Sequence, residues 1–461
     1  MNWNQIPAEI FDIIVRDLEL NDIKNLRLVN KASAERCLGP RLLSFASTAE
    51  TDLTEQSLWD LMAHSLHPAF GPAVRKLRVL SICFDHVGKH VVFEFNSSPA
   101  PAWGGSWWDD LRSITVPSAT YDMNWLREQQ QIRDSLSDQV IIDFLGPAIS
   151  SFTGLENVTL RSWVTTSPGQ KWPPYEGFAP VTARWTSHVC YLTLAAVAGS
   201  KTTAKSLNLF TEAETPAERG SNVRTYPQIC SGVLWRELSS HVTKIHQTYG
   251  EIQLPFDDLS IQVRAEDDAI KQTSTSMFPS LFSASSSNDE AKDDFSSLTR
   301  LLRLMPGLRN LDVCFNQKGR CNPVYYGHIF TGIAELSFPQ LRNLHLQNLS
   351  ITSAAILRFL KSHRMIHHLY LEGLSIPADE EWGPVFSFLS EEMKDLLVLV
   401  LSECFRGESQ IRLYPDVFFK QYFTTRPFLP ISSVNNSGPD LHMIFPYGIA
   451  AKAAKEKGQW E

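Results

Sequence analysis

The chain has 461 residues and a formal net charge of −8, with 43% hydrophobic and 20% charged residues. This composition excludes a chain that is disordered throughout, and the acidic balance argues against a nucleic-acid-binding surface spread over the whole protein. The sequence has no apolar run long enough to cross a membrane and no signal-type segment at its start, and its seven scattered cysteines indicate a reducing compartment.

Residues 1–45 predict a set of short helices. Pro7 suits the first position of a helix whose apolar residues recur at helical spacing over residues 10–18, and Asn21 or Asp22 is expected to cap a second helix. The segment carries more large apolar side chains than about 40 residues can bury by themselves. Part of its apolar surface is therefore expected to contact another part of the chain or another protein.

After residue 70 a short pattern recurs in which apolar residues occupy the first, fourth and sixth of six positions. The pattern occurs at residues 77–82, 111–116, 155–160, 204–209, 256–261, 308–313, 341–346, 366–371 and 396–401. Helical stretches lie between several of these segments, for example at residues 354–362 and 385–394. A strand followed by a helix, repeated with this strand pattern, predicts a leucine-rich-repeat solenoid, regular at its end and degenerate in its middle.

Two segments differ in composition from the repeats. Residues 265–297 hold seven acidic residues against two lysines, together with many serines, which predicts a solvated, disordered insertion. Residues 450–461 are rich in alanine and lysine and are expected to form a short tail.

The N-terminal segment resembles an F-box. The residues that carry the resemblance are Ile6-Pro7-Ala8-Glu9-Ile10, Ile13-Ile14, Leu18, Asp22-Ile23, Leu26-Arg27-Leu28-Val29 and Lys31. The F-box motif reads Leu-Pro-x-Glu-Ile/Leu, then Ile, Leu, Asp-Leu and Leu-Arg-Leu-Val-x-Lys, and this sequence keeps its order and spacing. The remaining chain is similar to the long, leucine-rich F-box proteins. We therefore expect an α/β fold with an all-helical F-box (1–45), an irregular leucine-rich-repeat solenoid (46–449) and a tail (450–461).

The resemblance implies an adaptor of a ubiquitin ligase. In such proteins the F-box docks on a Skp-type linker protein, which ties it to a cullin–RING ligase, and the second domain captures the substrate protein. The linker-binding residues carried over by position are Pro7, Ile10, Ile13, Leu18, Leu26 and Val29. The alternative for these side chains is that they only cap the solenoid, because terminal repeats need a cover.

Nothing in the sequence predicts catalysis, a metal or a cofactor. A phosphate-binding glycine loop, Gly-x-Ser-x-Gly and His-Glu-x-x-His are all absent from the sequence. The histidines at 363, 367 and 368 and the cysteines at 314 and 321 lack the further converging ligands that zinc needs. The adaptor would act by proximity, holding its substrate near a charged enzyme.

Polar residues precede the last apolar position of most repeats, where strand alternation turns them away from the buried leucines. These residues are Ser81, Thr115, Thr159, Asn208, Ser260, Asp312, His345 and Tyr370, with Val400 in the same position of the last repeat. The residues of this row in the later repeats are large, and their polar groups can form directional hydrogen bonds. Asp312, His345 and Tyr370 are therefore the predicted substrate-binding residues.

Two other functions stay open at this point. The first alternative to the adaptor is a scaffold that uses the F-box and repeats without ligase activity. The second is an enzyme whose site is assembled from dispersed residues. Under the main hypothesis the partners are a Skp-type linker and an unidentified protein substrate, without nucleic acid or membrane, in the cytoplasm, the nucleus or both.

Overall fold

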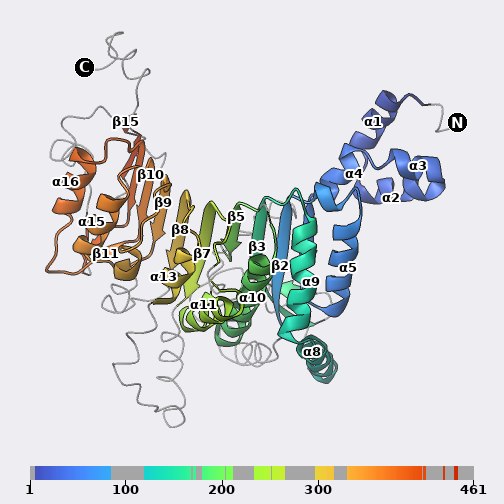
Figure 1. Ribbon diagram of the computed structural model, residues 1–461, viewed down its shortest axis with the longest axis horizontal. Coiled ribbons are helices and arrows are strands. Elements are labelled where there is room, and N and C mark those ends of the chain that lie inside the picture. Colours follow the sequence, from blue (N-terminus) through green and yellow to red (C-terminus); the bar gives the residue numbers. More distant parts are fainter. Residues whose placement is uncertain are drawn as a thin grey trace, which may run out of the picture. The chain divides into compact units, whose positions relative to one another are not determined.

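Figure 1 shows the computed structural model of the chain. The chain divides into two compact units. The first contains residues 1–172 and 192–206, and the second contains residues 173–191 and 207–461. The residues that the structure describes are 6–84, 119–167, 170–172, 179–202, 204–210, 233–250, 252–264, 296–315, 330–407, 409–411, 429–430 and 441–444. Within these ranges none of the helices combines the length and the apolarity that a membrane span needs.

The first unit begins with four short helices, which we call the N-terminal helical segment. They are α1 (Ala8–Arg16), α2 (Leu20–Val29), α3 (Lys31–Arg36) and α4 (Pro40–Phe45). Pro7 is the N-cap of α1, one position before the expected place, and α2 begins before Asn21 and Asp22, so neither residue caps it. The side chain of Asn30 caps α3 by accepting a hydrogen bond from the backbone N–H of Ser33 at 2.8 Å.

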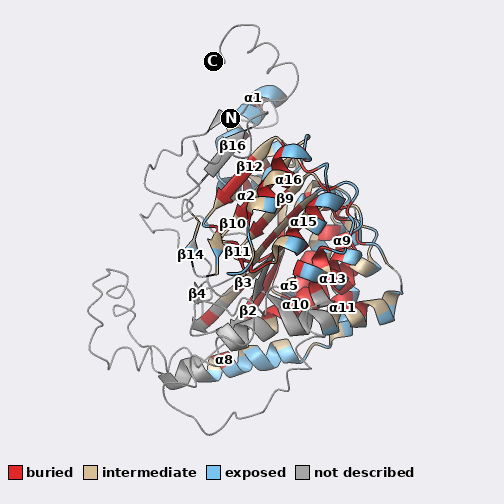
Figure 2. Cartoon of the chain, turned by 90° about the vertical axis from the view of Figure 1, so that its left-hand side faces the viewer, coloured by how far each residue is buried: buried red, intermediate tan, exposed pale blue. Residues whose placement is uncertain are grey.

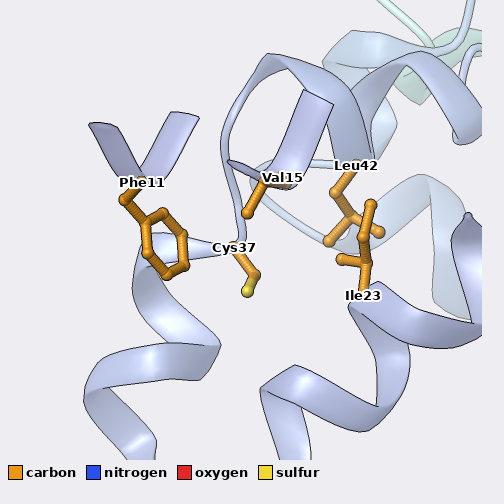
Figure 3. Packing of buried hydrophobic residues seen from close by; sticks show 5 residues of the cluster. All are labelled: Phe11, Val15, Ile23, Cys37 and Leu42. Carbon is orange, nitrogen blue, oxygen red and sulfur yellow. The ribbon is translucent and has the colours of Figure 1, made fainter. Parts of the chain in front are cut away.

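A small core holds these helices together (Figure 3). Its buried members are Phe11, Val15, Ile23, Cys37 and Leu42. They come from α1, α2 and α4 and from the residue that ends α3. The helical segment therefore has a hydrophobic core of its own, but α1 contributes Phe11 and Val15 to it, whereas Ile10 and Ile13 of the apolar spacing that the sequence emphasised are exposed.

The rest of the first unit is built on parallel strands. Its elements are β1 (Thr48–Thr51), α5 (Glu55–Leu66), the 3₁₀ turn η2 (Gly71–Ala73), β2 (Lys76–Phe84), α8 (Ala119–Asp134), α9 (Asp138–Ser151), β3 (Asn157–Ser167) and β4 (Gln170–Trp172). Strand β2 lies between β1 and β3 and is parallel to both, and β4 pairs antiparallel with β3. Thr54 and Ser137 cap α5 and α9 through their side-chain oxygens, which explains where these helices begin. Helix α10 (Ala179–Gly199) and strand β5 (Ser206–Leu209) each contain residues of both units.

The second unit is also mostly parallel. Its helices are α11 (Trp235–Tyr249), α13 (Ser296–Arg303), α15 (Ser353–Ser362) and α16 (Gly383–Glu391). The strands of its main sheet are β6 (Val233–Leu234), β7 (Asp258–Arg264), β8 (Asn310–Phe315), β9 (Asn343–Gln347), β10 (His368–Glu372), β12 (Val398–Ser402), β15 (Leu429–Pro430) and β16 (Leu441–Ile444). Strands β7, β8, β9, β10 and β12 lie side by side in this order and are parallel, and β16 adds an antiparallel strand beyond β12. A second, small sheet contains β11 (Ser375–Ile376), β13 (Phe405–Arg406) and β14 (Ser409–Gln410).

The buried leucines of the repeats form the core of this unit. In β8, β9 and β10 every second residue is buried, so the leucines of each strand point to one face and the polar residues between them point to the other. Helices α13, α15 and α16 lie together on one side of the strands (Figure 2), and buried residues of α15 and α16 belong to the same core. The repeating apolar pattern therefore identifies these strands and their buried face.

The predicted fold class, an all-helical F-box followed by an irregular leucine-rich-repeat solenoid, is wrong. The described residues form an α/β architecture in which a mostly parallel sheet is combined with helices, and no closed solenoid occurs among them. A repeated strand with one apolar face, followed by a helix, is a property that solenoids share with open parallel α/β sheets. The pattern specifies the repeating unit but not the architecture that the units assemble into.

Three sequence predictions fall on residues that lie outside the described part of the chain. They are the acidic insertion except for its last two residues, which begin α13, the tail at 450–461, and the repeat segment at 111–116, which includes Thr115.

Candidate functional site

The N-terminal helical segment exposes a group of large apolar side chains. Ile10 is 49% exposed and Ile13 is 53% exposed, and these residues lie three apart on α1, where they share a face. At the end of α2, Val29 is 59% exposed and Leu28 is 84% exposed. Water is an unfavourable environment for such side chains, because burying one fully is worth about 1.5–3 kcal/mol.

The six predicted linker-binding residues divide into two sets. Pro7, Ile10, Ile13 and Val29 are exposed, whereas Leu18 and Leu26 are half-buried against the core of the helical segment. Leu26 and Val29 therefore do not share one accessible face, although they are three residues apart.

Leu28 is the most exposed large apolar residue of this segment, and the sequence did not single it out. The one feature of the sequence that points to Leu28 is its place in the run Leu26-Arg27-Leu28-Val29. In the structure Leu26 turns inward and Leu28 turns outward. Sequence spacing alone does not say which of the two is accessible.

The polar face of the second unit carries the predicted substrate-binding residues. The register of the strands aligns Ser260 with Asp312, Asp312 with His345, and His345 with Tyr370, so these side chains form one row across β7, β8, β9 and β10. Adjacent strands are about 4.8 Å apart. The equal position of each residue after its leucine predicts this neighbourhood, and the register shows it.

His345 is the centre of a charged cluster on this face. Its Nδ1 atom lies 2.9 Å from Asp312 Oδ1, and its Nε2 atom lies 3.6 Å from Glu372 Oε1. The ring of Tyr370 is in edge-on contact with the imidazole, with 5.7 Å between ring centroids. Ser260 Oγ donates a hydrogen bond of 2.5 Å to Asp312 Oδ2. Glu372 is a residue of the cluster that the sequence did not point to, because it follows the last leucine of its repeat.

The two carboxylates control the protonation of the histidine. Burial disfavours the imidazolium, but the interactions with Asp312 and Glu372 outweigh this effect and raise the pKa of His345 to about 9. Burial also raises the pKa of the nearby Cys314 thiol to about 12, and the charges of the same two carboxylates add to this shift. At neutral pH the cluster therefore contains an imidazolium, two carboxylates and a thiol that holds its proton.

A row of amides lies beside the cluster. Asn310 Nδ2 donates to Asp258 Oδ1, and Asn343 Nδ2 donates to Asn310 Oδ1, so the row continues across three strands. Together with the charged cluster, these amides surround an open hollow of about 420 Å³. The residues that line it are Asn310, Leu311, Asp312, Asn343, Leu344, His345, Tyr370 and Glu372.

The early members of the predicted polar row do not extend this surface. In the register of β2 and β3, Ser81 pairs with Ser162 rather than with Thr159, and it lies on the same face of its strand as Leu77 and Val79. Ser81 and Thr159 are both fully buried. Of Ser81, Thr159, Asp312, His345 and Tyr370, only the last three are partly exposed.

The chemistry of the cluster differs from that of a hydrolase. A serine nucleophile needs its hydroxyl against the imidazole that removes its proton. Here the Ser260 hydroxyl donates to the carboxylate, on the oxygen that does not face the histidine. Within the described residues, no group of three histidine, cysteine or acidic side chains is arranged to hold a metal ion.

His363, which the sequence also singled out, is a buried structural residue. Its Nε2 atom accepts a hydrogen bond of 2.8 Å from the backbone N–H of Phe338, and its Nδ1 atom lies 2.7 Å from the backbone oxygen of Phe359. Both ring nitrogens are used inside the protein, so this histidine has no free ligand atom.

Comparison with models of known protein families and with curated proteins found no match for this chain.

Proposed function

We propose that the protein is the substrate adaptor of a Skp–cullin–F-box type ubiquitin ligase. In this proposal the N-terminal helical segment docks on a Skp-type linker protein, and the polar face of the second unit captures the substrate protein. The protein has no catalytic residue of its own in this role, and it acts by raising the concentration of the substrate near a ubiquitin-charged enzyme. The place of action is the cytoplasm, the nucleus or both.

The observation that carries the proposal is the exposure of Ile10, Ile13, Leu28 and Val29. All four belong to the positions on which the resemblance to the F-box rests. The helical segment buries its own core without them, so their apolar surface is available to a partner. The exposure of these side chains also argues against the capping alternative, because a residue that only caps its neighbouring elements would be covered by them.

The charged cluster supports the second half of the proposal. Asp312, His345 and Tyr370 place a carboxylate, a charged imidazole and an aromatic ring on one accessible face. Aromatic side chains frequently dominate binding at protein interfaces, with losses of about 2 kcal/mol or more on truncation. The variant Tyr370→Ala with His345→Ala is therefore expected to lose substrate capture and to keep linker binding.

The linker interaction is tested by co-purification of the full chain with a Skp-type linker protein. The test variant carries Ile10→Glu with Ile13→Glu, and the control carries Leu66→Glu, which adds one carboxylate at an apolar side chain of α5 that is more exposed than either isoleucine. A carboxylate that is buried in an interface without a partner costs several kcal/mol, so we expect capture to fall at least about a hundredfold in the test variant and to stay unchanged in the control.

Three outcomes would count against parts of the proposal. If the test variant captures the linker protein normally, Ile10 and Ile13 do not form the docking surface. If the unmodified chain binds no linker protein, the adaptor hypothesis is refuted and the enzyme alternative is favoured. Linker binding without recruitment of a cullin would leave a scaffold in place of a ligase adaptor.

A further inference from the structure

The hollow on the second unit is lined by groups that accept hydrogen bonds and carry negative charge. Asp312 and Glu372 contribute two carboxylates, and lysine and arginine are absent from the described residues that line it. Among these lining residues, the one positive group is the imidazolium of His345, which balances only one of the two carboxylates. The hollow therefore keeps a net negative charge at neutral pH.

The neighbouring amides reinforce this polarity. The side-chain N–H groups of Asn310 and Asn343 donate along the row toward Asp258. Asn343 keeps its amide oxygen as an acceptor at the far end of the row, together with the second N–H of its amide nitrogen. The row brings a third carboxylate, that of Asp258, close to the hollow.

The interactions inside the cluster are incomplete. Although His345 Nδ1 and Asp312 Oδ1 lie at ion-pair distance, neither Asp312 Oδ1 nor His345 Nε2 has a hydrogen-bond partner of good geometry in the described part of the chain. Both atoms are buried. The side chains of Asp312 and Glu372 are nevertheless 37% and 32% exposed where they line the hollow, so each carboxylate has an accessible part that can accept a hydrogen bond from a ligand.

We propose that this hollow binds the cationic side chain of an arginine or lysine, so that the substrate of the adaptor is a protein with an accessible basic segment. The inference rests on the proposed function, which requires a protein substrate. The carboxylates of Asp312 and Glu372 would receive the N–H donors of the guanidinium or ammonium group, and the ring of Tyr370 would contact the cation. Acidic or phosphorylated segments do not fit, because the same carboxylates repel them.

The binding of a cation is coupled to the proton of His345. The groups that face His345 from the neighbouring strands are Asp312 on β8 and Tyr370 and Glu372 on β10, with Cys314 close to both carboxylates. An arriving cation shares these carboxylates with the imidazolium and favours loss of its proton. The affinity for the cation is therefore expected to increase as the pH rises from 7 toward the pKa of His345 at about 9.

The experiment uses the full chain and three blocked pentapeptides with arginine, citrulline or glutamate between glycines. Citrulline has the shape of arginine without its charge. Dissociation constants are measured by ligand-observed NMR titration at pH 7.0 and pH 9.0. We expect the arginine peptide to bind about tenfold more tightly than the citrulline peptide, and the glutamate peptide to bind no better than the citrulline peptide.

Variants then locate the site. Asp312→Asn and Glu372→Gln are each expected to weaken binding of the arginine peptide by about tenfold, whereas the matched control Glu391→Gln, an exposed carboxylate at the end of α16, leaves it unchanged. His345→Gln should remove the increase in affinity between pH 7.0 and pH 9.0, and Tyr370→Phe, which removes the phenol, should keep it. Thermal melting curves of all variants show whether each one is folded, and with two independent carboxylate variants the test survives the loss of one.

The inference is overturned if the arginine peptide does not bind, if citrulline or glutamate peptides bind equally well, or if both carboxylate variants bind like the unmodified chain. Linker capture is measured on the same preparations. Loss of peptide binding with intact linker capture would refute only the basic-substrate inference, and loss of linker capture with intact peptide binding would refute only the adaptor function.

Discussion

His363 links the stability of the second unit to pH. Its ring is buried and stacks on Phe359, with 4.1 Å between ring centroids. Nε2 accepts the backbone N–H of Phe338, which requires that Nε2 carries no proton, so Nδ1–H is the donor to the Phe359 carbonyl. The folded protein therefore needs the neutral imidazole, and burial lowers the pKa of His363 from its ordinary value.

The size of the effect follows from these contacts. In the variant His363→Phe, the ring still fills the space between its neighbours, but the buried N–H of Phe338 loses its acceptor, which costs about 1–3 kcal/mol of the free energy of unfolding. The pH effect has a defined sign. Because the pKa is lower in the folded state, the unfolded state binds the proton first, and stability falls as the pH drops below about 6.5, by up to about 1.4 kcal/mol per pH unit.

Urea unfolding of the unmodified chain and of His363→Phe, at pH 7.5 and at pH 5.5, tests both statements. We expect the variant to be less stable at pH 7.5 and the difference between the two proteins to shrink at pH 5.5. Other histidines with a lowered pKa, such as His64, affect both proteins equally and cancel in this comparison. A difference between the two proteins that is the same at both pH values would refute the assignment of the neutral, doubly bonded ring.

Further predictions concern backbone conformation, the core of the helical segment and a helix cap, and urea unfolding measures all three. Gly373→Ala should lower stability by about 1–2 kcal/mol, because φ is +62° there and the added Cβ would meet the side-chain oxygen of Asn348. At Gly250, where φ is +75° but the space is open, the loss should be smaller. Leu26→Ala should lower stability by about 1–3 kcal/mol without preventing linker capture in the cold, since Leu26 packs against the core; loss of capture with unchanged stability would contradict this. Asn30→Ala should cost about 1 kcal/mol by removing the cap of α3, and an unchanged unfolding midpoint would contradict the cap.

The sequence predicted the strands of the second unit well, for a physical reason. Alternation of leucine with polar residues has a period of two, which only an extended strand can bury on one side. Because Asp312, His345 and Tyr370 follow the leucines of their repeats at the same distance, the parallel register brings them together. Glu372 lies two residues further along the same face, where the repeat pattern has ended, and so the pattern does not point to it.

The same reasoning fails where both faces of a strand are buried. In β2 the residues from Val79 to Ile82 are all buried, and the apolar pattern then fits two registers. The sequence selected the register that turned Ser81 outward, whereas the structure pairs Ser81 with Ser162 and turns it inward. The fold class was wrong for a related reason, because a local period describes each strand and its helix but not how many units assemble or whether they close.

The linker-binding surface shows a third limit of spacing. Leu26 and Leu28 are two residues apart on α2, and both match the motif. Leu26 packs against the core of the helical segment, whereas Leu28 is almost fully exposed. Which leucine faces outward depends on the packing of α2 against its neighbours, and this information is absent from the helical period alone.

The measurement that tests the account most directly is amide hydrogen exchange of the full chain with and without a purified Skp-type linker protein. The account predicts that binding slows exchange in the peptides that cover α1 and α2, residues 8–29, and leaves the peptides that cover β9 and β10, residues 343–372, unchanged. Binding that protects β9 and β10 but not α1 and α2, or the absence of any complex at micromolar concentrations, would contradict the proposal that the exposed apolar residues of the N-terminal helical segment form the docking surface.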